Sequence, residues 1–184
     1  MFRICVICTG NRCRSPFAEA ILRQASVGLP IEVTSVGLLD IGPAGVPPEL
    51  LEVAANMDVD LKGHRARAIS TVVPTDFDLF LGMDRDHVSS AVIDRGAPPD
   101  KTFTVMEAVR LLKQIDIPAE DDPVERARLL LKRAHEHRHA HPSFVSGEGI
   151  PDPLGGPKKG YVAMAAQLRD LCLELVALLF RPLR

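Results

Sequence analysis

FRICVICTGNRCRSP, residues 2–16, is the stretch that decides the fold. Its first half, residues 2–8, is a short and nearly continuous apolar run rich in Ile and Val, which is typical of a strand buried on both faces of a parallel sheet. A polar turn at Gly10 follows. Ser15 and Pro16 then have the order of a helix N-cap and a first helical residue. The stretch therefore predicts a strand, a loop and a helix.

The rest of the chain alternates strand and helix candidates. Further strands are expected at residues 30–37, 77–83 and 101–104. Helices are expected at residues 49–57, 85–93 and 161–179. Another helix is expected to follow the strand at 101–104 and to end at residue 112. This alternation predicts an α/β fold with a doubly wound, four-stranded parallel sheet and helices on both faces. The charged segment 115–150 is expected to contribute an inserted amphipathic helix near 122–140.

Composition narrows the class of protein. The chain has 184 residues, 46% of them hydrophobic and 25% charged, which suits one domain spanning residues 1–184. Its 22 Lys and Arg against 24 Asp and Glu give a formal net charge of −2, which argues against a nucleic-acid partner. No apolar run approaches the roughly 20 residues of a membrane span, and no secretory signal is recognisable. We therefore expect a cytoplasmic protein with no membrane partner.

The loop of residues 8–15, hereafter the Cys8 loop, has the composition of an anion site. Where a strand gives way to a helix, backbone N–H groups and the positive end of the helix dipole converge on a tetrahedral oxyanion. Arg14 adds a two-pronged contact to phosphate oxygens. The same positive surroundings should hold the Cys8 thiol as a thiolate at neutral pH. A thiolate beneath a bound phosphate is an activated nucleophile.

Thiolate attack on a phosphomonoester also needs a proton donor for the leaving oxygen. Asp152 lies between two prolines, just before the last predicted helix, and is the candidate for that role. After the leaving group departs, the same carboxylate can activate a water molecule that hydrolyses the cysteinyl-phosphate. The scheme requires neither a metal nor an organic cofactor, so we expect none.

These residues resemble those of the low-molecular-weight protein tyrosine phosphatase family. The family pattern C-x-G-N-x-C-R-S-P matches without a break from Cys8 to Pro16. The similarity continues at residues 34–37, 63–67, 83–84 and 152–153. The resemblance implies the family's doubly wound fold and a hydrolase that acts through a cysteinyl-phosphate intermediate. Its substrate would be protein phosphotyrosine or a small phosphomonoester, with inorganic phosphate as the product.

The resemblance also implies a role for individual residues. Cys8 would be the nucleophile, Arg14 would stabilise the transition state, and Asp152 would act as general acid and then as general base. The implied phosphate-binding residues are Thr9, Gly10, Asn11, Arg12, Cys13 and Ser15.

Further roles implied by the resemblance concern support and protection of the loop. Ser15 would also stabilise the thiolate. Asn11, Ser35 and His64 match a buried polar network that supports the loop. Cys13 matches a neighbouring cysteine that forms a reversible disulfide with the nucleophile and protects it from further oxidation.

Several positions depart from the family pattern and bear on the substrate. The family often has aromatic residues directly after the Asp-Pro pair and in the loop after the second strand. This chain has Leu154 at the first place and Leu38 and Leu39 at the second, and it contains no Trp and one Tyr. Arg12 replaces a small or aliphatic residue. An extra cation there would favour a substrate with a second negative group and disfavour a cationic phosphoguanidinium.

Other functions are compatible with parts of the pattern. A thiol-dependent arsenate reductase would need resolving cysteines after the third strand, but residues 82–90 contain none. A small-molecule phosphatase with little phosphotyrosine activity also fits. A non-catalytic phosphate-binding module would be expected to have lost Cys8, Arg14 or Asp152, and all three are present. Alternate histidines from residue 135 to 141 suggest a metal, but their spacing of two places them on different helix faces.

Overall fold

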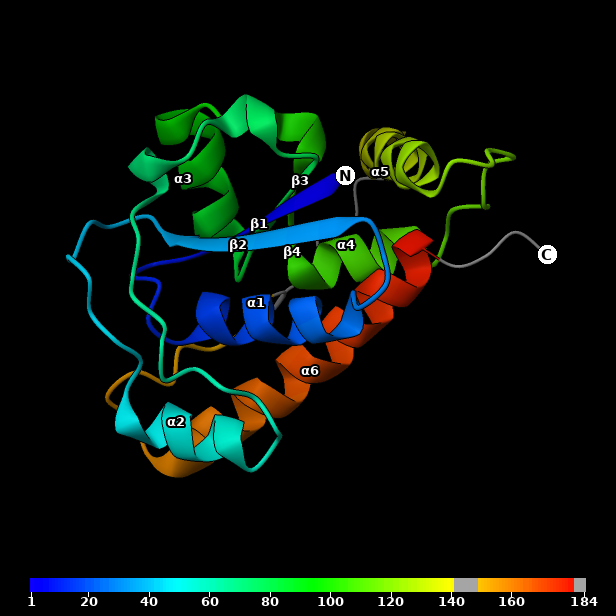
Figure 1. Cartoon of the computed structure of the whole chain (residues 1–184). Coiled ribbons are helices and arrows are strands. Elements are labelled where there is room, and N and C mark those ends of the chain that lie inside the picture. The colour runs from blue at the N-terminus through cyan, green and yellow to red at the C-terminus, as the bar shows by residue number, and fades with distance from the viewer. Residues whose placement is uncertain (141–148, 181–184) are drawn as a thin grey trace.

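The computed structural model describes residues 1–140 and 149–180. At its centre is a parallel sheet with the strand order β2-β1-β3-β4 (Figure 1). The strands are β1 (Phe2–Cys8), β2 (Ile31–Gly37), β3 (Leu79–Gly82) and β4 (Thr102–Thr104). The four-stranded parallel sheet predicted from the sequence is thus confirmed.

The helices also follow the predicted alternation. They are α1 (Arg14–Ala25), α2 (Pro48–Ala55), α3 (Arg85–Arg95), α4 (Val105–Leu112), α5 (Pro123–Ala140) and α6 (Lys158–Phe180). Single 3₁₀ turns occur at η1 (Ile69–Thr71), η2 (Pro74–Asp76) and η3 (Pro99–Lys101). No helix in the described ranges is long and apolar enough to cross a membrane.

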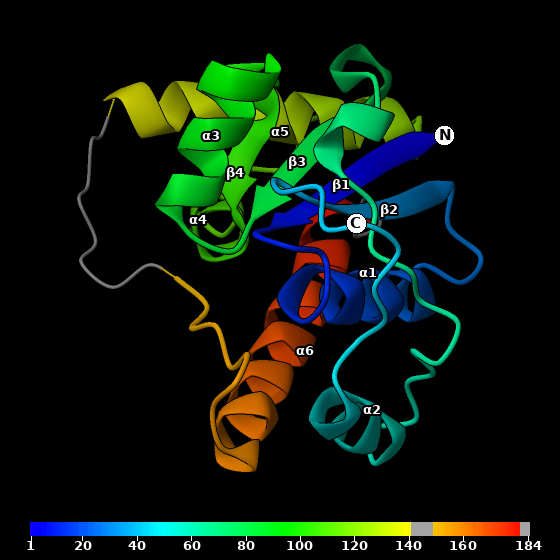
Figure 2. The same cartoon turned by 90° about the vertical axis from the view of Figure 1, so that its left-hand side faces the viewer.

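Both faces of the sheet are covered, which explains the unbroken apolar run of β1. Phe2, Ile4 and Val6 point into the larger core, which α1 and α6 share. Cys5 and Ile7 point to the opposite side, into a smaller core with Ala91 of α3. Figures 1 and 2 show α1 and α6 on one side of the sheet and α3 on the other. The sheet is therefore doubly wound, as predicted.

The inserted helix α5 packs against α4 and α6. Its apolar stripe is buried, and it consists of Val124, Ala127, Leu130, Leu131 and Ala134. None of its residues lines the cavity at the Cys8 loop. Residues 141–148, which join α5 to the segment before α6, lie outside the described residues, and so does His141 of the alternating histidines.

The prediction that Ser15 caps α1 is wrong. The N-cap position is Cys13, which makes no side-chain capping bond, and Ser15 lies inside the first turn with no exposed surface. Its hydroxyl contacts the Cys8 sulfur instead. Pro16 remains tolerated because the first helical turn leaves its N–H groups without intrahelical partners. The Ser-Pro pair is thus part of the loop's support, and the helix begins two residues earlier than a Pro16 start predicts.

Close backbone packing fixes the Cys8 loop against the end of β2. The N–H groups of Leu38 and Leu39 donate to the carbonyls of Cys8 and Thr9, both at 2.9 Å. A Cβ atom added to Gly37 would lie 2.8 Å from the Gly10 carbonyl carbon, so only glycine fits there. The loop therefore sits at the carboxyl end of β1, where β2 and β3 flank it on opposite sides, the usual position of a ligand site in such sheets.

Candidate active site

The Cys8 loop contains a strained residue, Asn11, whose φ of 51° lies in the left-handed region. Its side chain is completely buried, and its Nδ2 donates to the Oγ of Ser15 at 2.9 Å and of Ser35 at 2.8 Å. Its Oδ1 accepts from the backbone N–H of Arg67 at 2.9 Å. Its carbonyl oxygen lies 2.7 Å from Nε2 of His64. Four hydrogen bonds therefore hold the loop in a conformation that the backbone alone disfavours.

Ser15 links this network to the cysteine. Its Oγ lies 3.0 Å from the Sγ of Cys8, and both residues are buried. The Ser15 oxygen accepts from Asn11, and its own hydrogen can point to the Cys8 sulfur at 3.0 Å or to the more distant Val36 carbonyl at 3.4 Å. A hydroxyl that donates to sulfur stabilises the thiolate over the thiol.

The network ends at a buried carboxylate, that of Glu19 in α1. The Ser35 hydroxyl donates to Glu19 Oε2, while Glu19 Oε1 lies 2.6 Å from Nη2 of Arg23 one turn later. Glu19 has only 6% of its surface exposed, so the ion pair with Arg23 is needed to compensate its buried negative charge. Sequence reasoning missed Glu19. The signal that points to it is an acidic residue four positions after Ser15, on the helix face that follows the loop.

Arg14 is almost fully buried and its guanidinium has several acceptors. Nη2 lies 2.6 Å from Oδ2 of Asp152, and Nη1 lies 3.4 Å from Oδ2 of Asp84 and 3.3 Å from the carbonyl of Ile150. Its Nε is buried and has no hydrogen-bond partner within the described part of the chain. An unsatisfied cationic donor beside the cysteine is what an incoming oxyanion would satisfy.

Four side chains, with Arg14 as one of them, form a closed ring of contacts. Arg14 Nη2 lies 3.3 Å from Thr9 Oγ1, which lies 3.0 Å from His87 Nε2. His87 Nδ1 lies 2.6 Å from Asp84 Oδ1, and the other Asp84 oxygen returns to Arg14. The Asp84 carboxylate also caps α3 by accepting from the His87 N–H at 2.9 Å. The ring and Asp152 together orient Arg14, and Nη2 contacts both Thr9 and Asp152.

Burial lowers the pKa of His87, and the nearby Asp84 carboxylate opposes that shift. A neutral imidazole can accept from the Thr9 hydroxyl through Nε2, while Nδ1 lies close to Asp84 Oδ1 but is not aligned for a hydrogen bond. Thr9 can then accept from Arg14 through its own oxygen. Sequence reasoning noted Asp84 only as part of the similarity at residues 83–84 and missed His87, although a spacing of three at a helix start places the two residues side by side.

Asp152 completes a cavity of about 240 Å³ above the cysteine. Its Oδ1 accepts from the N–H of Leu154 at 3.1 Å, which fixes the carboxylate in the loop before α6. The cavity is lined by Cys8, Thr9, Gly10, Arg12, Cys13, Arg14, Leu39, Ile41, Asp152 and Leu154. The structure therefore brings Cys8, Arg14 and Asp152 together. The side chains of Asn11 and Ser15, also predicted to bind phosphate, lie behind the loop and support it.

The rim of the cavity is aliphatic. Leu39, Ile41 and Leu154 are all among the exposed large apolar residues, and no aromatic side chain from the described residues lines the cavity. Arg12 is half-buried and donates from Nε to the carbonyl of Gly45 at 3.0 Å. This bond holds the guanidinium at the rim, where it adds a positive charge beside the three aliphatic side chains and the exposed Thr9 and Asp152.

The four cysteines are all free thiols and all buried. Burial, followed by the charges of Asp152 and Cys8, raises the pKa of Cys13 to about 12. Burial alone raises the pKa of Cys172 to about 12, and it also raises the pKa of Cys5. These three sulfurs are therefore protonated at neutral pH.

The described residues contain no group of three or more His, Cys, Asp or Glu side chains arranged to hold a metal ion. His135 and His139 do contact each other, with ring centroids 4.5 Å apart. His135 Nδ1 lies 2.8 Å from Nη2 of Arg138, and a cation in that position opposes metal binding.

Comparison with known proteins places the chain among phosphatases. A family model described as "Low molecular weight phosphotyrosine protein phosphatase" matches residues 3–137, which ends before Asp152. The low molecular weight protein-tyrosine-phosphatase Etp of Escherichia coli K12 is 31% identical over 137 residues, which are 72% of this chain and 89% of Etp.

Solved structures share the fold over nearly the whole chain. A low molecular weight protein tyrosine phosphatase from T. tengcongensis superimposes with a TM-score of 0.68 and 25% identity, and the match covers 96% of this chain and 98% of that one. The YwlE arginine phosphatase from Geobacillus stearothermophilus gives a TM-score of 0.65 and 24% identity over 95% of this chain and 90% of its own.

Proposed function

Because the chain belongs to the low molecular weight phosphotyrosine protein phosphatase family, we propose that it hydrolyses protein phosphotyrosine through a phosphorylated Cys8. The observation that carries this proposal is that Cys8, Arg14 and Asp152 line one cavity at the carboxyl end of β1. A nucleophile, an oxyanion-binding fork and a proton carrier are the three parts that phosphoryl transfer to a cysteine needs.

In the first step, the phosphoryl group occupies the Cys8 loop and competes with Asp152 for the guanidinium of Arg14. Once Arg14 turns to the phosphate, the Asp152 carboxyl is free to carry a proton. The Cys8 thiolate attacks phosphorus, so the S–P bond forms while the bond to the ester oxygen breaks. Asp152 gives its proton to that oxygen, and tyrosine leaves as the neutral phenol.

In the second step, a water molecule takes the place of the tyrosine. The Asp152 carboxylate removes a proton from this water as its oxygen attacks phosphorus. The S–P bond breaks and inorganic phosphate is released. The sulfur leaves as a thiolate, which the Ser15 hydroxyl at 3.0 Å stabilises. No metal or organic cofactor takes part in either step.

The rim supports a narrower substrate class. Its aliphatic side chains can flank a phenyl ring, and Arg12 adds a positive charge that suits acidic residues next to the phosphotyrosine. YwlE is an arginine phosphatase by name, but a phosphoarginine side chain would bring a cationic group close to Arg12. We therefore propose phosphotyrosine in an acidic sequence context as the substrate.

A small phosphomonoester with a second anionic group is the second candidate. The same Arg12 favours it, and the cavity of about 240 Å³ is large enough for a small ligand but has, among the residues that the structure describes, no aromatic wall to select a phenyl ring. Two further roles belong to the proposal. Cys13, which lines the cavity with Cys8, protects the nucleophile as a reversible disulfide. The protein acts in the cytoplasm, where four free thiols persist.

Hydrolysis of p-nitrophenyl phosphate and of phosphopeptides, without added metal, tests the proposal. We expect turnover by the wild-type protein, none by Cys8→Ser, and a preference for acidic phosphotyrosine peptides over phosphoserine and phosphoarginine peptides. Release of phosphate from small bis-anionic esters alone would favour the second candidate. An inactive protein that reduces arsenate with added thiols would overturn both.

A further inference from the structure

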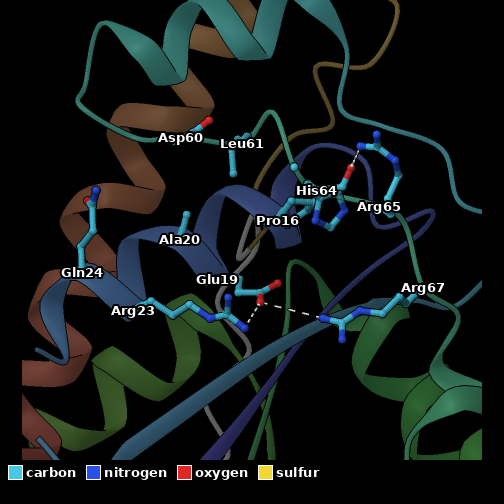
Figure 3. A pocket seen from close by; sticks show the side chains of 11 residues that line it. Pro16, Glu19, Ala20, Arg23, Gln24, Asp60, Leu61, His64, Arg65 and Arg67 are labelled. Atoms are coloured by element: carbon cyan, nitrogen blue, oxygen red, sulfur yellow. Dashed lines mark hydrogen bonds and ion pairs between the residues drawn. The ribbon is translucent and has the colours of Figure 1, made fainter.

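A second and larger cleft lies on the outer side of the network that supports the Cys8 loop (Figure 3). Its volume is about 710 Å³, within the range of small-molecule sites, and it shares no lining residue with the Cys8 cavity. One wall is a face of α1, formed by Pro16, Glu19, Ala20, Arg23 and Gln24. The other is formed by Asp60, Leu61, Gly63, His64, Arg65 and Arg67. We call it the α1 cleft.

The charges in the α1 cleft favour an anion. Figure 3 shows Arg23 and Arg67 directed towards the Glu19 carboxylate. Arg23 neutralises Glu19 at 2.6 Å, whereas Nη2 of Arg67 is 3.9 Å away, beyond hydrogen-bond distance. The second acidic residue, Asp60, uses Oδ1 to accept from a backbone N–H. The cleft is therefore lined by three arginines against two acidic residues, and Arg67 shares the Glu19 carboxylate with Arg23 as the looser of two ion pairs.

Arg65 adds a second cation on the same wall. It and Arg67 are exposed and flank the buried Ala66, and both line the cleft. Nη1 of Arg65 donates to the carbonyls of His64 at 2.7 Å and Lys62 at 3.4 Å, which orients the guanidinium and leaves its other donors available. Two guanidinium groups on one wall, of which Arg67 has only a loose carboxylate partner, suit a ligand with two oxyanion groups, because each fork binds such a group in a bidentate manner.

Three residues of the α1 cleft bond directly to the support of the Cys8 loop. His64 Nε2 contacts the Asn11 carbonyl at 2.7 Å, and the Arg67 N–H donates to Asn11 Oδ1 at 2.9 Å. Glu19 accepts from Ser35, which accepts from Asn11 in turn. We propose that the α1 cleft is an effector site for a small bis-anion, such as an organic diphosphate, and that its occupancy is transmitted to Cys8. Binding stands independently of the proposed function, whereas the effect on turnover rests on it.

The expected effect is inhibition. A bis-anion held by Arg65 and Arg67 places negative charge beside Glu19 and draws Arg67 away from it. That charge disfavours the thiolate that hydrolysis of the cysteinyl-phosphate must restore. p-Nitrophenyl phosphate has a good leaving group, so hydrolysis of the cysteinyl-phosphate limits its turnover, and kcat falls while the substrate site stays open. A competitor in the Cys8 cavity would instead raise KM and leave kcat unchanged.

Binding is tested with methylenediphosphonate, whose P–C–P bridge phosphoryl-ester chemistry does not cleave. The Cys8 loop is first saturated with vanadate, and ¹H–¹⁵N spectra are then recorded during the titration. We expect saturable shifts in residues 19–24 and 60–67, and a dissociation constant about tenfold weaker in the Arg65→Gln/Arg67→Gln double variant. Arg169→Gln, an exposed arginine of α6, is the matched control and should bind as the wild type does.

Two results of the titration would overturn the site: no saturable shift in those residues, or equal affinity in the double variant with an unchanged spectrum of the core. The kinetic arm measures kcat for p-nitrophenyl phosphate at saturating substrate. We expect methylenediphosphonate to lower kcat about twofold or more in the wild type and in Arg169→Gln, but not in the double variant. Binding without any change in kcat would overturn the transmission to Cys8, and an inactive wild type would overturn the proposed function while leaving the binding result intact.

Discussion

Nη2 of Arg14 lies 2.6 Å from Oδ2 of Asp152, so the residue that we propose binds phosphate is ion-paired with the residue that we propose carries the proton. The pair joins the start of α1 to the loop before α6, 138 positions apart along the chain. An arriving phosphate must displace Asp152 from Arg14. Substrate binding and release of the general acid are therefore one event.

Replacing Asp152 with Asn separates these two roles. We expect kcat for phenyl phosphate, which has a poor leaving group, to fall by about 10² to 10⁴. The loss should be smaller for p-nitrophenyl phosphate, whose leaving group needs little protonation. Vanadate should bind at least as tightly as to the wild type, because Arg14 loses a competing carboxylate. Equal losses on both esters together with weaker vanadate binding would show that Asp152 only positions Arg14.

His87 should make stability depend on pH. Burial lowers its pKa in the folded protein, so the unfolded chain binds a proton more readily below its ordinary value of about 6.5. Stability is therefore greatest above that value and declines as the pH falls towards the lowered folded pKa. We expect the melting temperature to drop between pH 7.5 and 5.5, and to drop less in His87→Asn.

His64 shares this direction because burial lowers its pKa too, so the His87→Asn protein should keep part of the slope. Thermal melts of the His64→Asn/His87→Asn double variant separate the two contributions. If the melting temperature depends on pH equally in the wild type and in both variants, other groups set the loss of stability in acid.

His87→Asn should also lower kcat/KM at every pH, because the ring through Thr9 and Asp84 opens.

Removing the Ser35 hydroxyl should destabilise the loop without touching the cavity. Ser35→Ala leaves a buried Glu19 oxygen and an Asn11 donor without their partner, which costs about 1 to 3 kcal/mol. Urea unfolding measures this loss, and Ser70→Ala, an exposed serine, is the control. We also expect lower kcat, because Asn11 holds a strained backbone. A variant as stable and active as the control would contradict the supporting role of the network.

Arg12 is predicted to bind acidic residues next to the phosphotyrosine. In Arg12→Gln, kcat/KM for peptides with acidic flanks should fall about threefold, the size expected for a half-buried charge contact. Values for p-nitrophenyl phosphate, which has no flanks, should stay the same. Side-by-side kinetics with acidic and neutral phosphotyrosine peptides measure the difference. Equal losses on the two peptides would indicate that Arg12 acts through Gly45 on the shape of the loop.

The fold was predictable because its signals are local. The buried run of β1 and the apolar stripes of α5 and α6 each follow from spacing in the sequence, and the structure confirms them. The actual role of Ser15 was not predictable. A good capping residue followed by proline has the same local preference whether its hydroxyl faces its own helix or the Cys8 sulfur. Only tertiary contacts decide between the two.

The site was predictable only in part for the same reason. Cys8, Arg14 and Asp152 stand out by their local patterns, and the structure places them around one cavity. Glu19 and His87 carry only a spacing, of four from Ser15 and of three from Asp84. Their roles become evident only in the fold, where β2 brings Ser35 to α1 and where Asp84, just after β3, lies beside Arg14. The pairing of Arg14 with Asp152 likewise depends on the return of the chain before α6.

Capture of the phosphorylated intermediate tests the central role of Cys8 most directly. The Asp152→Asn protein, in which hydrolysis of the intermediate is slowed, is mixed with p-nitrophenyl phosphate, quenched in acid and digested for mass spectrometry. We expect one added phosphoryl group on the peptide that contains Cys8, and none when Cys8→Ser is combined with Asp152→Asn. Release of p-nitrophenol with no phosphoryl group on Cys8, or with one on a different residue, would contradict the mechanism.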